Sequence, residues 1–463
     1  MTPRRTVLCL ATALWLAVGT VSAKDINVSL TGDDAGPGSR QAPYRTLSRA
    51  QSAARDSRRD HPAEPVTVWI NPGDWPLPEP LVFTEADSGT PEARVLYRAV
   101  PRAVVRLIGQ GIKSEPAAPL VQMQNASCLM LRGVTICEHP GVGLAITGGA
   151  ENVIAGCTLQ DLGGYAITIQ DGREHAIQSC DAQRAAGGIS ITGTEPLTAA
   201  TADSGHRVIN NHLYDLSASA IACGIAAEGQ PSAAVAGIHV SHNLIHDVRA
   251  PGIQGLGRNW VVEFNEVSRC GQTGIDLSQP LPHGGQHRIN DNLVHQVTDG
   301  FRVADGCGNE VHRNVAVQRI DRDAPHTLQL TTGFQEVPAE GSPVGAHSRI
   351  SNNLAVHFDV GFAIPSDGPA GFEHNLAVGC GTAWQVDQSV GELPLAFGKN
   401  RSYETNPGFV DPARLDFQLK SDAQALQDLP GLEAFPTDRV GLSLDKYRTR
   451  LPDSEILRRF SKP

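Results

Sequence analysis

One asparagine recurs through the second half of the chain at a fixed place in a repeated pattern. The stretch "HNLIHDVRAPGIQ" at 242–254 returns as "FNEVSRCGQTGID" at 264–276 and as "DNLVHQVTDGFR" at 291–302. The base period is about 22 residues, and we interpret the longer steps as insertions within single cycles. The column comprises Asn211, Asn243, Asn265, Asn292, Asn314, Asn353 and Asn375, and it continues upstream through Cys180, Cys157 and Val134.

Short runs of alternating apolar residues fill each cycle, which predicts strands that bury one face. In 259–277 the expected inward residues include Val261, Val267 and Ile275. Short parallel strands with a fixed period form a right-handed parallel β-helix, so we predict an all-β solenoid of roughly ten or more coils. Neighbouring coils lie ~4.8 Å apart, so equivalent side chains stack on one another. We therefore expect the asparagines to form a ladder that hydrogen-bonds the backbone of one corner.

A glycine commonly opens the second run of a cycle, and we expect it to supply a positive φ at the corner between strands. These glycines are Gly188, Gly252, Gly274, Gly300 and Gly361.

The ends of the chain depart from the period, which predicts caps on the open ends of the solenoid. Residues 25–30 predict a strand, and residues 45–56 predict a helix with Leu47, Ala50 and Ala54 on one face. We divide the chain into an export signal (1–23), an N-terminal cap with the first coils (24–110), the β-helix (111–400) and a C-terminal closing segment (401–463).

The first residues have the pattern of an export signal. Arg4 and Arg5 precede an apolar run and a small-residue site at 21–23, so we expect cleavage after Ala23 and a secreted or periplasmic protein. The formal net charge of −11 argues against nucleic acid or a membrane surface as a partner, and we expect a monomer. Eight cysteines remain beyond Cys9, without a CxxC pair or a zinc-site spacing. The stacked Cys157 and Cys180 are either two thiols or a disulfide.

Segments near both ends resemble a known superfamily. "INVSLTGDDAGPGSRQAPYRTLSRAQSAAR" (26–55), "PLVFTEADSGTPEARVLYRA" (80–99) and "NPGFVDPARLDFQLKSD" (406–422) resemble the pectate-lyase-like superfamily of secreted β-helix proteins, and within it glycoside hydrolase family 141. The resemblance implies hydrolysis of plant or algal polysaccharides by paired carboxylic acids on adjacent coils. The family pattern has two acids where this chain reads Gly-Gln-Thr-Gly (271–274), and Asp305 matches one acid of the next coil. Glu263 and Glu266 match a segment that is common just before the family's site.

An outward column offers a further acid. Ser190, Ala222, Gln254, Asp276 and Arg302 occupy equivalent positions, so Asp276 and Arg302 are expected one rung apart. This is either a surface ion pair or part of a catalytic site in which Asp276 works with Asp305. Asp299 is a spare candidate, although an aspartate before a glycine is typical of a turn.

Insertions after equivalent strands are expected to wall a groove along the solenoid. We take polar and aromatic residues near it as substrate-binding candidates, with aromatic rings either stacking on sugars or packing internally. They are Trp260, Phe301, Gln254, Gln272 and His283, with Trp384 as a further aromatic candidate.

Three functions remain open from the sequence. A glycoside hydrolase would use Asp276 and Asp305, supported by Arg302. A glycan-binding or structural protein would have lost the family acids. A polysaccharide lyase is disfavoured because no lysine occurs between Lys113 and Lys399 and an arginine base stays protonated. We expect no cofactor and no zinc site, while a Ca²⁺ ion stays open.

Overall fold

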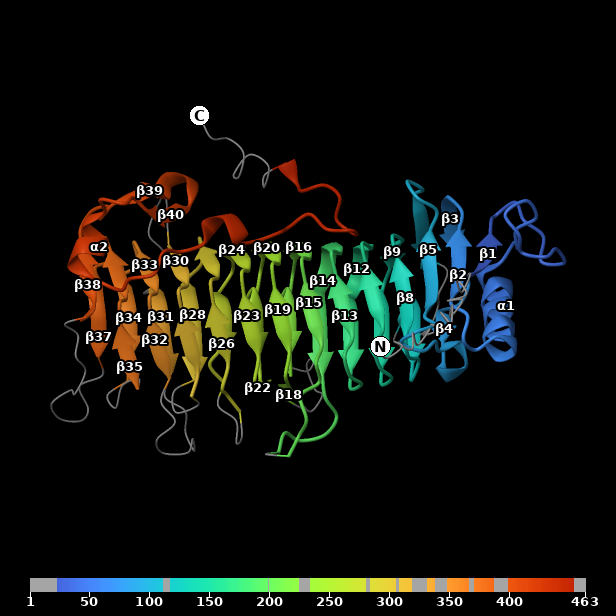
Figure 1. The fold of residues 1–463 in the computed structure, drawn as a ribbon, viewed down its shortest axis with the longest axis horizontal. Helices are drawn as coiled ribbons and strands as arrows, with labels where there is room; N and C mark the ends of the chain where they lie inside the picture. Colours follow the sequence, from blue (N-terminus) through green and yellow to red (C-terminus); the bar gives the residue numbers. More distant parts are fainter. Residues whose placement is uncertain are drawn as a thin grey trace, which may run out of the picture.

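The chain forms a right-handed parallel β-helix, as the repeat predicts, and Figure 1 shows its coils stacked along one axis. The computed structural model describes residues 23–110, 117–198, 200–224, 234–279, 284–304, 308–318, 331–337, 348–365, 370–386 and 399–453. A complete coil contributes one strand to each of three faces. Each strand pairs in parallel with the equivalent strand of the next coil.

The first face is a sheet of 13 strands that begins at residue 24. Its strands, in order, are β1 (Lys24–Val28), β2 (Val66–Ile70), β5 (Val95–Ala99), β8 (Leu129–Arg132), β11 (Val153–Ala155), β13 (Ala176–Gln178), β15 (Arg207–Ile209), β19 (His239–Ser241), β23 (Val261–Glu263), β26 (Arg288–Asn290), β29 (Glu310–His312), β32 (Arg349–Ser351) and β35 (Gly371–Glu373).

The second and third faces are joined because two long strands, β12 (Thr158–Gln170) and β14 (Asp181–Thr192), bend from one face into the other. The second face also holds β3 (Gly73–Pro76), β6 (Val105–Ile108), β9 (Thr135–His139), β16 (His212–Leu216), β20 (Leu244–Val248), β24 (Glu266–Cys270), β27 (Leu293–His295), β30 (Val315–Val317), β33 (Leu354–Val356), β36 (Leu376–Val378) and β38 (Arg401–Tyr403). The third face also holds β4 (Leu81–Phe83), β7 (Val121–Gln124), β10 (Leu144–Thr147), β17 (Ile221–Cys223), β21 (Ile253–Gly255), β25 (Thr273–Leu277), β28 (Asp299–Ala304), β31 (Thr332–Val337), β34 (Val360–Ile364) and β37 (Thr382–Val386).

The predicted asparagine ladder lies at the corner between the first and second faces, which we call the asparagine corner. The Nδ2 atom of Asn265 donates to Oδ1 of Asn292 at 2.9 Å, and the backbone N–H of Asn265 donates to the same oxygen at 3.0 Å. The pattern repeats from Asn211 to Asn375 and extends one coil beyond the predicted column to Asn400. The residue before each asparagine from Asn211 to Asn375 has a positive φ, so the ladder holds a strained corner in place.

A second ladder, which the sequence analysis missed, lies where the third face returns to the first. We call it the histidine corner, and its polar members are Asn152, His175, His206, His287 and Asn309. Each accepts a hydrogen bond from the backbone N–H of a residue one coil back, at 3.0–3.4 Å. All five side chains are buried. This corner thus satisfies buried backbone N–H groups as the asparagine corner does, but with both histidine and asparagine.

Two details of the packing differ from expectation. Val262 rather than Val261 points inward, because its Cα partners on both sides are the buried Val240 and Ile289. The glycines at the start of third-face strands do not adopt positive φ. They are required by close approach, because a Cβ at Gly274 would lie 2.2 Å from Cγ1 of Val294, and one at Gly188 would lie 2.2 Å from a backbone oxygen.

Helix α1 (Leu47–Asp60) and the loops around it form the N-terminal cap. Thr46 accepts a hydrogen bond from the backbone N–H of Arg49, which caps the helix, and Leu47, Ala50 and Ala54 are buried as predicted. The helix packs against β1 and β2 at the open end of the first face (Figure 1). A short 3-10 helix, η1 (Glu85–Asp87), supplies Asp87, which accepts hydrogen bonds from Arg55 of α1.

The C-terminal segment covers the outer side of the second face rather than only the last coil. Its elements are β39 (Phe409–Asp411), η3 (Pro412–Arg414), β40 (Asp416–Leu419), α2 (Gln424–Asp428) and η4 (Thr437–Arg439). Phe409, Phe417 and Leu429 pack on Leu354 and Leu376. Residues 433–451, which we call the returning segment, then run back along the asparagine corner past β24, β20 and β16 (Figure 1).

The described cysteines are thiols. Cys128, Cys137, Cys157, Cys180, Cys223, Cys270 and Cys380 are free, and Cys307 lies outside the described residues. Burial raises the pKa of Cys180 well above its ordinary value, so this thiol stays protonated and packs as a small apolar side chain. Of the two states that the sequence left open for Cys157 and Cys180, the structure contains the stacked thiols.

Candidate functional site

A row of polar side chains follows the outer surface of the third face, and we call it the polar row. Gln254 on β21, Asp276 on β25, Arg302 on β28 and Gln335 on β31 are direct Cα partners from coil to coil. The register upstream runs through Ala222 and Ser190, as predicted, and continues to Thr168. Successive side chains of the polar row are therefore separated along the axis by the distance between neighbouring coils, ~4.8 Å, which we call one rung.

Asp276 is the most constrained member of the polar row. Its Oδ1 accepts hydrogen bonds from the backbone N–H and the Oγ of Ser278, at 3.0 and 2.5 Å. Its Oδ2 faces Nη1 of Arg302 at 3.4 Å. The Asp276 side chain is 19% exposed and that of Arg302 is 33% exposed, so the pair is partly shielded but reachable from solvent.

A second carboxyl group, Asp299, lies next to this pair at the start of β28. It is paired in register with Thr273 of the preceding coil, and its Oδ1 accepts the backbone N–H of Thr332 at 3.2 Å. Burial raises the pKa of Asp299, and the negative charge of Asp276 adds to the shift, while Arg302 opposes it. The third face thus holds two carboxyl groups, Asp276 and Asp299, on neighbouring coils. Asp299 is the residue that the sequence offered as a spare candidate.

Two of the five predicted catalytic residues lie elsewhere. Glu263 is on the first face, where Nε2 of His239 approaches its Oε1 at 3.0 Å and this contact lowers its pKa. Glu266 is on the second face, only 4% exposed, with Oε1 3.3 Å from Nε2 of His295. Its rung neighbour Leu244 packs under Leu442 of the returning segment. Because the three faces point in different directions, neither glutamate lies on the polar row with Asp276.

The predicted sugar-stacking aromatics are internal. Trp260 is fully buried, and its Nε1 donates to the carbonyl of Val235 at 2.7 Å. Phe301 is 1% exposed and stacks on Phe334 with ring centroids 4.8 Å apart. Trp384 is half-buried and continues this stack at one end of the core. Their rings are occupied by core packing, so the prediction that Trp260 and Phe301 contact substrate is wrong.

The remaining candidates divide by location. Gln254 is half-buried on the polar row, and Gln272 is exposed in the turn just before β25, with its carbonyl accepting the backbone N–H of Thr298. Both therefore flank Asp276 on the side that faces solvent. Asp305 and His283 lie outside the described residues.

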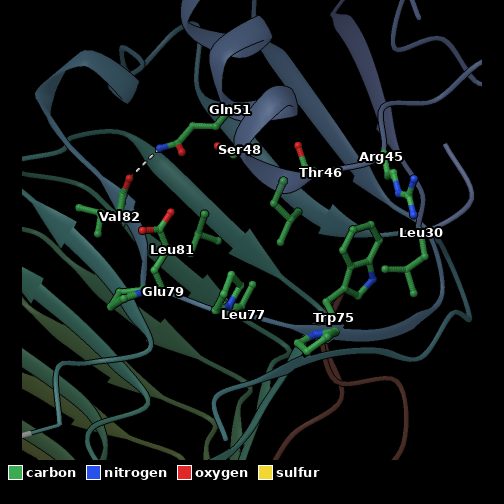
Figure 2. A pocket seen from close by; sticks show the side chains of 14 residues that line it. Leu30, Arg45, Thr46, Ser48, Gln51, Trp75, Leu77, Glu79, Leu81 and Val82 are labelled. Carbon is green, nitrogen blue, oxygen red and sulfur yellow. Dashed lines mark hydrogen bonds between the residues drawn. The ribbon is translucent and has the colours of Figure 1, made fainter. Parts of the chain in front are cut away.

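A separate cavity lies in the N-terminal cap and was not predicted (Figure 2). It has a volume of about 640 Å³ and lies between α1 and residues 75–82. Trp75, Leu77 and Leu81 supply an apolar wall, while Gln51 of α1 donates to the carbonyl of Val82 at 2.7 Å. No residue of the polar row lines this cavity.

Within the part of the chain that the structure describes, no three His, Cys, Asp or Glu side chains come together as metal ligands. The described helices include none that is both long enough and apolar enough to span a membrane.

Comparison with known proteins agrees with this architecture. The family described as "Right handed beta helix region" matches residues 198–320. No curated protein sequence matches the chain. A solved structure described as "Glycoside hydrolase" has a TM-score of 0.55 at 11% sequence identity, covering 92% of this chain and all of that one. An alginate lyase of the PL6 type, solved with a trisaccharide, gives 0.48 at 12% identity, with coverages of 91% and 95%.

A rhamnogalacturonan lyase gives a TM-score of 0.45 at 14% identity, covering 95% of this chain and 99% of that one. The family match and the likeness to the glycoside hydrolase structure show the fold, a right-handed parallel β-helix. The identities are too low to carry residue roles from one chain to another.

Proposed function

We propose that this is an extracytoplasmic enzyme that hydrolyses glycosidic bonds of a plant or algal polysaccharide lying on the third face. The observation that carries the proposal is the pair of carboxyl groups on neighbouring coils of one face. Asp276 lies against Arg302 and accepts hydrogen bonds from Ser278, while burial raises the pKa of Asp299 and so favours its protonated form. Hydrolysis of a glycosidic bond requires one protonated acid and one carboxylate in one site.

The geometry suits an inverting reaction better than a retaining one. Asp299 is the register partner of Thr273, so its Cα lies one rung and three residues from that of Asp276, ~11 Å away. Side chains that lean together bring such carboxyl groups to ~6.5–9.5 Å, the range that leaves room for water on the far side of the sugar. Asp299 would protonate the leaving oxygen, and Asp276 would take the proton of the attacking water.

Asp305 is the second candidate for the proton donor. It follows Arg302 by three residues in the sequence and lies outside the described residues. Gln254 and Gln272 flank Asp276 and are proposed to hydrogen-bond sugar hydroxyls, together with His283 of the neighbouring insertion. Substitution of the two candidate donors one at a time decides between them.

The test is release of reducing ends from a panel of plant and algal polysaccharides. We expect Asp276→Asn and one of Asp299→Asn and Asp305→Asn to lower turnover by about 10²-fold or more. The matched control is Asp161→Asn, because Asp161 forms the same kind of ion pair with an arginine of the next coil but lies off the third face. Unchanged turnover in the Asp276 variant rejects the assignment of the site.

A glycan-binding protein without catalysis is the alternative, and one observation favours it. Both oxygens of Asp276 already have protein partners, as in a structural ion pair on a sheet. In that case the wild-type protein binds polysaccharides but releases no reducing ends. A lyase is recognised in the same assay by the absorbance of an unsaturated uronate product.

A further inference from the structure

Two arginines on the outer surface of the first face lie directly beside each other without a carboxylate. Arg98 of β5 and Arg132 of β8 are register partners on neighbouring coils, so their Cα atoms are one rung apart. Both side chains are half-buried. Among the described residues, neither guanidinium has an ion pair with a carboxylate, and Nε of Arg98 is buried without a hydrogen-bond partner.

This arrangement contrasts with the arginines of other coils. Arg106, Arg184, Arg269 and Arg313 each pair with an aspartate of a neighbouring coil. Like charges placed opposite each other on adjacent strands are destabilising unless something compensates them. Burial and the charge of Arg132 lower the pKa of Arg98, and the chain as a whole is acidic. The missing counter-charge is therefore a local feature of these coils.

Aromatic rings fix both guanidinium groups in place. The guanidinium of Arg98 lies 4.5 Å from the ring centroid of Trp69, the preceding residue of the same column, and the Trp69 indole donates to Asp25 at 2.8 Å. Arg132 lies 4.9 Å from the ring of Tyr447.

The returning segment adds a third positive charge beside Arg132. The exposed Lys446 places its Nζ 4.8 Å from the same Tyr447 ring, and its backbone carbonyl accepts a hydrogen bond from Nη2 of Arg132 at 2.9 Å. Stacking on aromatic rings leaves the edges of a guanidinium free to donate, which is the geometry that recognises planar oxyanions.

We propose that Arg98, Arg132 and Lys446 form a binding site for an oxyanion, a carboxylate or a sulfate ester, carried by an acidic glycan. An oxyanion bridging Arg98 and Arg132 supplies the missing counter-charge and accepts from the buried Nε. The site lies on the first face and is separate from the polar row. Its assignment to a glycan, rather than to another bearer of the same group, rests on the proposed function.

The experiment is affinity electrophoresis of the full mature chain in gels containing polygalacturonate, dextran sulfate or neutral dextran. The first two arms distinguish a carboxylate from a sulfate, and the third measures retention without an oxyanion. We expect retention by one acidic polymer and about a tenfold or greater loss of affinity in Arg98→Gln. Because Arg132 also contacts the returning segment, Lys446→Gln provides the second variant, with a several-fold loss expected. Binding is read without turnover, so an inactive polar row does not affect the outcome.

The matched control is Arg207→Gln. Arg207 is also on the outer surface of the first face, exposed and without a carboxylate partner among the described residues, so the change in net charge is the same. Three outcomes overturn the proposal. The first is that neutral dextran retains the protein as strongly as the acidic polymers do, and the second is that Arg207→Gln loses as much affinity as Arg98→Gln. The third is that neither Arg98→Gln nor Lys446→Gln changes the affinity. A folded Arg98 variant is verified by an unchanged cooperative thermal transition.

Discussion

The asparagine corner and the histidine corner solve one problem with different chemistry. Both satisfy buried backbone N–H groups with a side chain from the next coil, on successive coils from Asn211 to Asn400 at the asparagine corner and on five coils at the histidine corner. At the asparagine corner an uncharged amide both donates and accepts. At the histidine corner Nδ1 of His175 and of His206 accepts a backbone N–H, which requires the neutral imidazole.

Two corners that must satisfy the same backbone N–H groups can therefore differ greatly in how their stability depends on pH. An amide does not titrate, so the asparagine corner is the same at any ordinary pH. Burial lowers the pKa of His175 to about 4 and those of His206 and His287 to about 3. The folded chain therefore keeps these imidazoles neutral. Because the unfolded chain can protonate them, the free energy of unfolding decreases as the solution becomes more acidic.

The largest effect is expected from breaking the asparagine corner at its centre. Asn292→Ala removes the acceptor of both nitrogen atoms of Asn265 and the donor to the carbonyl of Val262. Leaving such buried groups unsatisfied costs about 1–3 kcal/mol each, so we expect a loss of about 2–6 kcal/mol in the free energy of unfolding. Urea denaturation measures it.

The control for that variant is Asn259→Ala. Asn259 is half-buried and donates to Asp203 at the surface, outside either ladder. Because Asn259 has a φ of 57°, where alanine is disfavoured, a loss of only about 1 kcal/mol is expected there. Similar losses in both variants would show that the asparagine column has no special structural role.

Lowering the pH is expected to destabilise the histidine corner and not the asparagine corner. The unfolded chain takes up protons on these histidines near pH 6.5, whereas the folded chain does so only near pH 3–4. Stability is therefore complete above about pH 6.5 and is lost as the pH falls towards 4, by on the order of 1–2 kcal/mol for each buried imidazole at pH 5. Thermal denaturation at a series of pH values follows this loss.

His206→Asn keeps a hydrogen-bond acceptor in the ladder but removes the titratable imidazole, because an amide carries no ionisable group. We expect a shallower dependence of stability on pH between 6.5 and 4 in this variant. His61→Asn is the control, since His61 is exposed just beyond α1 and its replacement should leave the slope unchanged. A wild-type slope in His206→Asn contradicts the assignment.

The smallest effect is expected where the asparagine column gives way to cysteine. The backbone N–H of Cys180 donates to Oδ1 of Asn211, and this bond does not depend on the thiol. Cys180→Ala removes only a small packed group, so we expect a loss of about 1 kcal/mol. Denaturation under reducing conditions measures it, and a loss as large as that of Asn292→Ala would mean that the thiol is part of the ladder's hydrogen bonding.

The sequence predicted those features that repeat. The period placed Asn243 above Asn265 and Asp276 beside Arg302 correctly, because parallel strands convert a constant spacing into a contact. The histidine corner escaped notice since its members change identity and irregular insertions precede them. No column of identical letters marks it.

The site was predicted less completely, because the face on which a side chain lies depends on where the corners of its coil fall, and the sequence did not give those corners. Glu263, Glu266 and Asp276 are close in sequence, yet a strand ends and a face turns between each of them. Trp260 and Phe301 are single aromatic residues, and their internal stacking partners lie on other coils. The raised pKa of Asp299 arises from burial, which an Asp-Gly dipeptide does not reveal.

The route of the returning segment has a consequence for how the chain is completed. A stack of coils can ordinarily grow from any point, since each unit touches only its neighbours. Here Arg448 donates to Asp181 across 267 residues of sequence. The coil that carries Asp181 can therefore gain this contact only after the returning segment has been made.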